Sequence, residues 1–172
     1  MTLFHEIKPD KREDALCRGL MQGDGGDKRN AAINKADAFL RELQPGHLVR
    51  AGVDRQANIF CYLTHGKQVL DITTGDTRDP AAIARDHGAA MLRVEADERR
   101  CYVSDIDAYD QIKDLLIAGK IAQARQRAPA YWQHVIPLAK YAGQFRRPEV
   151  LVTYDIPSSG LSTIARQEQD GH

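Results

Sequence analysis

The stretch Arg147–Pro157, Arg-Pro-Glu-Val-Leu-Val-Thr-Tyr-Asp-Ile-Pro, places one glutamate, Glu149, at the start of a run of strand-forming residues. β-branched and aromatic side chains alternate with their neighbours through Val150, Val152 and Tyr154, a pattern typical of a half-buried strand. Pro148 and Pro157 bracket the run as breakers that cannot donate a ladder hydrogen bond. The pattern predicts a strand with Glu149 at its first position.

Glu149 has two interpretations at this stage. A glutamate at the mouth of a strand can point into a cleft while its backbone is held rigidly, which suits a catalytic carboxylate. The same residue could instead be a solvated side chain that caps an edge strand. The stretch alone favours neither.

Length and charge set the class of protein. A chain of 172 residues is long enough to bury a core without disulfides or metals, so we expect one domain over residues 1–165 and a polar C-terminal tail over 166–172. The 24 basic and 24 acidic residues balance, so no overall positive field indicates nucleic acid, although a local basic groove is not excluded.

The cysteines indicate neither disulfides nor a metal. Cys17, Cys61 and Cys101 are an odd number at spacings unlike any zinc motif, and we expect reduced core residues in a cytoplasmic protein with no metal site. No apolar run approaches the roughly 20 residues that a membrane span needs, and no signal peptide is recognisable.

Hydrophobic periodicity predicts alternating strands and helices along the chain. The predicted strands are 3–7, 58–63, 89–96, 101–106 and the last one after 147, with a short final strand or turn over 158–164. Helices are predicted from Asp10 to Gly19, over 29–43 and 80–87, and in two pieces between Asp107 and 138, with Trp132 in the core. Segment 69–72 fits either state.

The connections carry further expectations. The polar run 97–100 predicts a hairpin between the strands on either side of it, and the glycine-rich segment 22–27 is predicted to be a flexible loop. Asp105, Asp107 and Asp110 are better explained by capping, with Asp107 as the cap of the next helix, than by a metal site. Four arginines could line a groove for phosphates or form a solvated face: Arg125, Arg127, Arg146 and Arg147.

The order of these elements is not a βαβ repeat. It favours an α+β domain with a mainly antiparallel sheet and flanking helices.

Three segments together resemble the ADP-ribosyltransferase fold. The opening Leu3-Phe4-His5-Glu6-Ile7, followed by Ala15-Leu16-Cys17-Arg18-Gly19-Leu20, resembles its first strand and helix, and Arg55 to Leu63 resembles its next strand. The segment Pro148-Glu149-Val150-Leu151-Val152 resembles the Ala-Glu-Val-Leu-Val segment of the DarT-type DNA ADP-ribosyltransferases, which carries their catalytic glutamate. The resemblance implies a split, mainly antiparallel sheet.

The resemblance also implies a reaction, in which the nicotinamide glycosidic bond of NAD is cleaved and ADP-ribose passes to an acceptor. A carboxylate can stabilise the oxocarbenium-like ribose, and Glu149 is the candidate. Arg55 is the first candidate to grip the pyrophosphate or ribose, with Arg18 and Arg50 as lesser ones. His5 is a candidate contact to NAD, or else a satisfied structural residue, and Tyr62, within the stretch Arg55 to Leu63, is a further candidate contact.

The implied partners follow from this class. The resemblance implies single-stranded DNA or RNA as the acceptor in an enzyme of toxin or phage-defence type, with an antitoxin or inhibitor as a further partner. The balanced net charge leaves a protein side chain or a small molecule open as the acceptor instead. Two alternatives remain open: an RNA 2′-phosphotransferase-like enzyme that relies on His5 and Arg55, and a non-catalytic domain of the same fold that binds a nucleotide or a protein.

Overall fold

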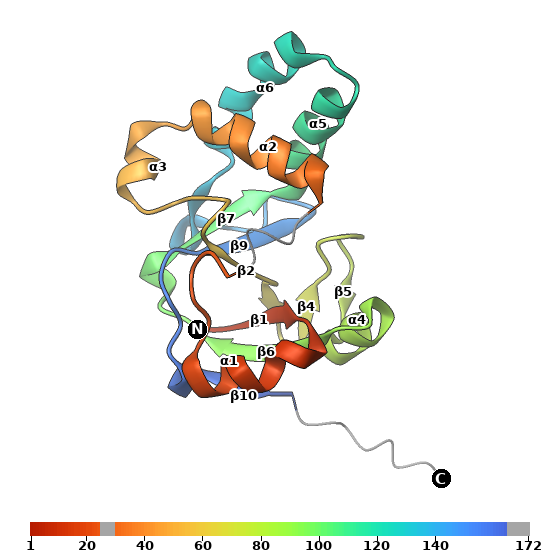
Figure 1. Ribbon diagram of the computed structural model, residues 1–172, viewed down its shortest axis with the longest axis vertical. Helices are drawn as coiled ribbons and strands as arrows, with labels where there is room; N and C mark the ends of the chain where they lie inside the picture. Colours follow the sequence, from red (N-terminus) through yellow and green to blue (C-terminus); the bar gives the residue numbers. More distant parts are fainter. Residues whose placement is uncertain (25–29, 165–172) are drawn as a thin grey trace.

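Two antiparallel sheets, a small third sheet and a set of helices form the described part of the molecule (Figure 1). The computed structural model describes residues 1–24 and 30–164, so the predicted tail over 166–172 and part of the glycine-rich loop lie outside the described residues. In this part of the chain no helix has the length and apolar character that crossing a membrane requires. The predicted class, a mixture of helices and mainly antiparallel strands, is confirmed.

The first sheet has the strand order β1-β6-β10 and the second has the order β2-β9-β7-β8. All the pairings within them are antiparallel, and one isolated bridge between Phe4 and Tyr62 joins the two sheets. A small third sheet, β3-β4-β5, lies beside them. The strands are β1 Thr2–Ile7, β2 Ile59–Cys61, β3 Thr64–His65, β4 Gln68–Leu70, β5 Thr77–Arg78, β6 Ala90–Glu95, β7 Cys101–Asp105, β8 Ile136–Pro137, β9 Pro148–Val152 and β10 Leu161–Thr163.

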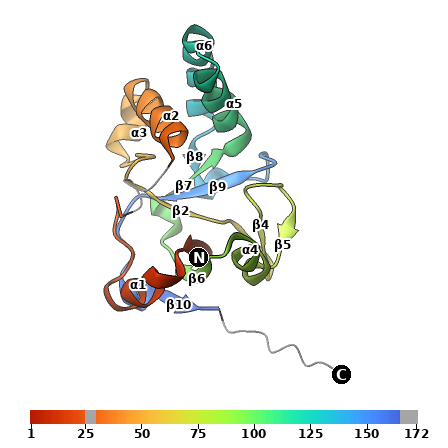
Figure 2. The ribbon, with the colours of Figure 1, turned by 45° about the vertical axis from the view of Figure 1, so that its right-hand side comes forward.

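The helices divide between the two sheets. Helices α2, α5 and α6 cover the outer face of the second sheet, α1 lies beside the first sheet, and α4 stands next to the small third sheet (Figure 2). Their bounds are α1 Arg12–Arg18, α2 Ala31–Glu42, α3 Gly46–Arg50, α4 Pro80–His87, α5 Ile106–Ile117 and α6 Ile121–Gln133. Short 3-10 turns occur at Pro9–Lys11, Glu98–Arg100, Leu138–Lys140 and Ser158–Gly160.

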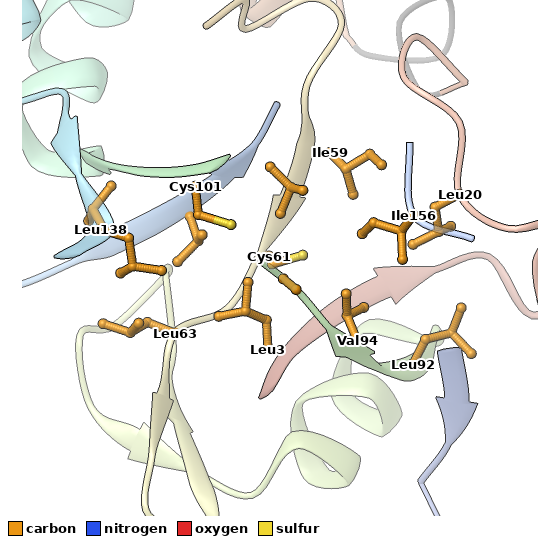
Figure 3. Packing of buried hydrophobic residues seen from close by; sticks show 14 of the residues in the cluster. Leu3, Leu20, Ile59, Cys61, Leu63, Leu92, Val94, Cys101, Leu138 and Ile156 are labelled. Atoms are coloured by element: carbon orange, nitrogen blue, oxygen red, sulfur yellow. The ribbon is translucent and has the colours of Figure 1, made fainter. Parts of the chain in front are cut away.

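The main core lies between the two sheets (Figure 3). Alternate residues of the strands supply it, because successive side chains of a strand point to opposite faces. Leu3, Leu92 and Val94 of the first sheet meet residues of the second, among them Ile59, Cys61, Val150 and Val152. A second core fills the space between β9 and the helices, and it contains Leu151 and the predicted core residue Trp132.

The predicted hairpin between β6 and β7 is wrong. The two strands are consecutive in the chain, but β6 pairs with β1 and β10 while β7 pairs with β8 and β9. The 3-10 turn Glu98–Arg100 carries the chain from one sheet to the other, with Asp97 capping it through a hydrogen bond to the Arg99 amide. The crossover lets apolar residues of β6 and β7 meet across the core instead of pairing edge to edge.

Three local expectations also need correction. The strand β9 is buried throughout rather than half-buried, because it lies inside the second sheet with helices on one face and the first sheet on the other. Cys17 is exposed on α1, whereas Cys61 and Cys101 are buried. The cap of α5 is Asp105, whose side chain accepts from the amide of Asp107.

One glycine ends α1 at a point where no other residue fits. Gly19 has φ +93°, and a Cβ atom there would lie 2.3 Å from the carbonyl oxygen of Ile156. The next residue, Leu20, exchanges backbone hydrogen bonds with Ile156, so the chain after α1 is held against the segment that follows β9.

Candidate functional site

Arg55 lies in the turn before β2 and is the centre of a buried polar network. Only 6% of the residue is exposed. Its Nε donates to Oδ1 of Asp37 on α2 at 3.0 Å, and its Nη1 donates to Oε2 of Glu149 on β9 at 2.9 Å. The two residues predicted to carry catalysis, Arg55 and Glu149, are therefore in direct contact.

Hydroxyl groups and aromatic rings complete the surroundings of Arg55. Its Nη1 also donates to the hydroxyls of Tyr131 and Ser104, at 3.0 and 3.3 Å. The guanidinium carbon stands 4.0 Å from the centre of the Tyr109 ring and 4.9 Å from that of Phe60, within the range of cation–π attraction. The Tyr109 hydroxyl donates to Asp37 Oδ1 at 2.9 Å, which links the helices to the same carboxylate.

The electrostatic balance keeps Arg55 charged. Burial alone would lower the pKa of Arg55, but the oxygens of Tyr131, Glu149 and Asp37 outweigh it and raise the pKa well above its usual value. Burial also raises the pKa of Tyr131, so its hydroxyl stays protonated. The network is a fixed cation held between two buried carboxylates.

Glu149 uses its two carboxylate oxygens differently. Oε2 accepts from Arg55 and, at 3.4 Å, from Ser104, the residue opposite Glu149 in the β7–β9 register. Among the described residues no donor contacts Oε1. In the same residues the one fully buried side-chain nitrogen or oxygen without a hydrogen-bond partner is Trp132 Nε1, so Oε1 of Glu149 is not fully buried. Oε1 therefore keeps contact with solvent, although Glu149 is only 6% exposed. The alternative that Glu149 caps an edge strand in solvent is wrong, because β9 lies between β2 and β7.

A cavity of about 380 Å³ lies at the end of α1, against β1 and β2. His5 and Arg18, two of the predicted nucleotide contacts, line it, and so does Phe60, whose ring touches Arg55. Charged side chains of both signs surround its mouth: Glu6, Lys8, Lys11, Asp14, Arg18 and Asp24. Arg55 and Glu149 themselves do not line the cavity, and Phe60 is the lining residue that contacts Arg55.

His5 is fixed by the backbone of β2. Its Nδ1 lies 2.8 Å from the carbonyl oxygen of Phe60, which can only accept, so Nδ1 carries the proton and Nε2 is left as an acceptor. Burial lowers the pKa of His5 because the imidazolium would lose its hydration. The ring is therefore neutral near pH 7 and can accept a hydrogen bond from a hydroxyl.

Arg18 stands at the rim of the cavity. Half of its side chain is exposed, and its guanidinium pairs with Asp14 at 2.6 Å and with Asp24 at 2.9 Å. The hydrogen bond to Asp14 is the main cause that raises the pKa of Arg18. The two carboxylates hold the arginine at the end of α1, where its remaining surface faces solvent.

The other two predicted contacts lie elsewhere. Tyr62 follows β2 and donates its hydroxyl to Oε2 of Glu6 at 2.8 Å, but it does not line the cavity. Arg50 is the exposed last residue of α3 and lies outside both the cavity lining and the Arg55 network.

The clustered aspartates and two of the four arginines form one network. Arg147 donates to Asp107 at 2.7 Å and to Asp110, and Arg146 donates to both oxygens of Asp107. These pairs join the segment before β9 to α5. Among the residues that the structure describes, no group of three potential ligands is placed to hold a metal ion.

Sequence reasoning missed Asp37, Ser104, Tyr109 and Tyr131. Asp37 is 1% exposed on α2, beside the core residues Ala36 and Leu40. Tyr109 and Tyr131 have the helical spacing of core residues, which gives no sign that their hydroxyls point at Arg55. Asp37 follows the apolar residue Ala36 in the predicted helix, and nothing in the sequence shows that its side chain is buried.

Comparison with known proteins adds no family to this picture. No protein-family model, no curated protein and no solved structure matches the chain. A function has to be argued from the chemistry of the site.

Proposed function

We propose that this chain is an NAD-dependent ADP-ribosyltransferase that cleaves the nicotinamide glycosidic bond and transfers ADP-ribose to an acceptor. The observation that carries the proposal is Glu149. One of its oxygens is fixed by Arg55 and Ser104, and the other has no donor among the described residues and reaches solvent. A fixed carboxylate with one open oxygen suits the stabilisation of a developing positive charge.

The cavity supports NAD as the substrate. Its volume of about 380 Å³ is in the size class of small-molecule sites, roughly 300–1,000 Å³. Lys8, Lys11 and Arg18 supply positive charge for a pyrophosphate, and His5 supplies an acceptor for a ribose hydroxyl. NAD contributes the chemistry of a cationic leaving group, so the protein needs to orient the ribose and stabilise its charge.

We assign Arg55 a positioning role rather than a direct contact to phosphate. The sequence suggested a pyrophosphate anchor, but Nε and Nη1 donate to Asp37 and Glu149 inside the protein. The guanidinium donates to Oε2 of Glu149 and so holds its carboxylate in one orientation. Arg18, at the cavity rim, is the better placed arginine for the pyrophosphate.

The test is nicotinamide release from NAD by the purified chain, alone and with single-stranded DNA or RNA. Glu149→Gln is nearly isosteric and removes the charge, and Glu98→Gln is the matched control because Glu98 is exposed in a turn far along the chain. We expect Glu149→Gln to lower the rate at least about 100-fold and the control to leave it unchanged. Circular dichroism establishes that all three proteins are folded.

Each outcome has a defined meaning. Faster release in the presence of one nucleic acid identifies that acceptor class. Equal release by the wild type and Glu149→Gln contradicts the role of Glu149. No release by the folded wild type under any condition contradicts NAD chemistry, and removal of a 2′-phosphate from RNA is then the reaction to assay.

A further inference from the structure

A second cavity of about 480 Å³ adjoins the first and shares its wall. Glu6, Ile7 and Lys8 line both cavities, whereas His87 and Gly88, at the end of α4, line only the second. A transferase has two substrates, and two adjoining cavities with a common wall can hold them side by side. The second substrate would then contact the side chains on the common wall.

Three polar side chains meet at Oε2 of Glu6. The Tyr62 hydroxyl donates to this oxygen at 2.8 Å, and His87 Nδ1 lies 2.8 Å from the same oxygen. Because a carboxylate only accepts, His87 Nδ1 carries the proton and Nε2 is the ring's acceptor atom. About a third of each side chain of the His87–Glu6 pair is exposed, so the ring is accessible from the cavity.

This arrangement has the form of a histidine base oriented by a carboxylate. The carboxylate fixes the tautomer and stabilises the imidazolium that forms when Nε2 takes a proton. Tyr62, which donates to the same carboxylate, has its pKa raised chiefly by burial and then by its hydrogen bond to Glu6, so it stays a donor.

We propose that His87 is the proton acceptor for the second substrate and that Glu6 is its positioning residue. The substrate class is a neutral nucleophile that carries an O–H or N–H group. This proposal rests on the proposed function and adds that the acceptor binds in the second cavity, beside His87.

The step balances as follows. Nε2 of His87 removes the proton of the acceptor, and the lone pair of its oxygen or nitrogen forms a bond to C1′ of the ribose. The bond from C1′ to the nicotinamide nitrogen breaks, and its electron pair neutralises the nicotinamide ring. The proton stays on His87, paired with Glu6, until water removes it.

Other charged groups lie around His87. Lys8 and Asp10 lie across the cavity, and Arg85 and Asp86 are its neighbours on α4. Asp86 is bound to Arg78 of β5, which offsets its charge. Glu6 is the group in hydrogen-bond contact with the ring, so its removal is expected to have the largest effect.

The experiment measures nicotinamide release with water as the simplest O–H acceptor, and product partitioning when methanol competes with water. The variants are His87→Gln, His87→Lys and the control His65→Gln, because His65 is exposed on β3. We expect His87→Gln to lower kcat about 100-fold with KM for NAD unchanged. His87→Lys keeps a hydrogen-bond donor for Glu6 but offers no base near pH 7, so it should be equally slow.

Three results separate the possibilities. If the wild type releases nicotinamide and His87→Gln does so at the same rate with the same pH profile as His65→Gln, this assignment is overturned and the proposed function stands. Full activity of His87→Lys also overturns it, because the pair would then be structural. If the wild type itself releases none, the proposed function falls and this assignment falls with it.

Discussion

Replacement of Arg55 by methionine is the most direct test of the buried network. Arg55 faces two buried carboxylates, Asp37 and Glu149, which are 1% and 6% exposed. Methionine preserves much of the volume and can still pack on the rings of Tyr109 and Phe60. The change therefore removes the charge and its hydrogen bonds while it disturbs packing little.

The expected cost follows from the burial of both partners. Removal of one partner of a buried ion pair costs about 3–5 kcal/mol, because the remaining charge is left without compensation. Here two carboxylates lose the same partner, so we expect the upper part of that range for Arg55→Met. For a chain of this size each kcal/mol lowers Tm by about 3 °C, so the loss corresponds to a fall of roughly 10 °C or more.

Urea unfolding followed by fluorescence measures this loss, because Trp132 is the only tryptophan and is buried next to Tyr131. Arg93→Met is the matched control, since the Arg93–Glu95 pair is about half exposed and such pairs contribute at most about 1 kcal/mol. The triple variant Arg55→Met, Asp37→Asn, Glu149→Gln should be more stable than Arg55→Met, because no bare carboxylate remains. A loss below about 1 kcal/mol for Arg55→Met would show that water reaches the network.

Three further predictions concern single positions. Burial lowers the pKa of His5, so the neutral ring contributes stability above the ordinary pKa of about 6.5, and this contribution is lost as pH falls through the lower folded-state pKa. Asparagine can still donate to the Phe60 carbonyl but does not titrate. In urea titrations His5→Asn should therefore show a smaller fall in unfolding free energy between pH 7 and 5 than the wild type. Gly19→Ala should cost at least about 2 kcal/mol, because its Cβ would collide with a backbone oxygen, whereas Gly23→Ala, with a similar φ and open space, should cost about 1 kcal/mol; equal losses in thermal melts would contradict the close contact. A thiol reagent should modify one cysteine of the native chain, the exposed Cys17, and all three after unfolding, because burial raises the pKa of Cys101 to about 12 and that of Cys61 further; rapid labelling of more than one thiol in the native state would refute this.

The local elements were predictable where apolar periodicity and breakers agree. Helix α4 has the predicted bounds because Asp79 caps it, Pro80 begins it and Gly88 ends it with φ +63°. Strands β1 and β9 also lie where the sequence pattern predicts strands. The five-residue helix α3 was missed, since Pro45-Gly46 reads as the end of one helix and not as the start of another.

Strand pairing was less predictable than strand position. The run 97–100 has the polar character of a hairpin turn, and nothing in it distinguishes a turn within one sheet from a crossover between two. The difference depends on partners far away in the chain, since β6 is paired to β1 and β7 to β9. Periodicity within a segment carries no information on such partners.

In the candidate site, too, the residues beside local patterns were predictable and those brought in by long-range packing were not. Glu149 stands out at the start of a strand pattern, and Arg55 is a candidate through the resemblance to the ADP-ribosyltransferase fold. In the structure Nη1 of Arg55 lies 2.9 Å from Oε2 of Glu149. Asp37, Tyr109 and Tyr131 belong to the site only because α2, α5 and α6 pack on one face of β9. That packing follows from the fold as a whole, so the sequence near each residue could not reveal its role.

The position of Glu149 is fixed by the charges around the start of β9 as well as by the sheet. Arg147, two residues before Glu149, donates from Nη1 to the carbonyl of Ile72 at 3.2 Å, and from Nε to Asp107 on α5 at 2.7 Å. The carbonyl of Arg147 accepts from the amide of Ile106, so this backbone is tied to α5 at both the main chain and the side chain. Only 12% of the Arg147 side chain is exposed, so solvent screens these bonds little. The proposed reaction would gain from such a rigid support, because the protein would then not have to reorganise when a positive charge develops beside Glu149.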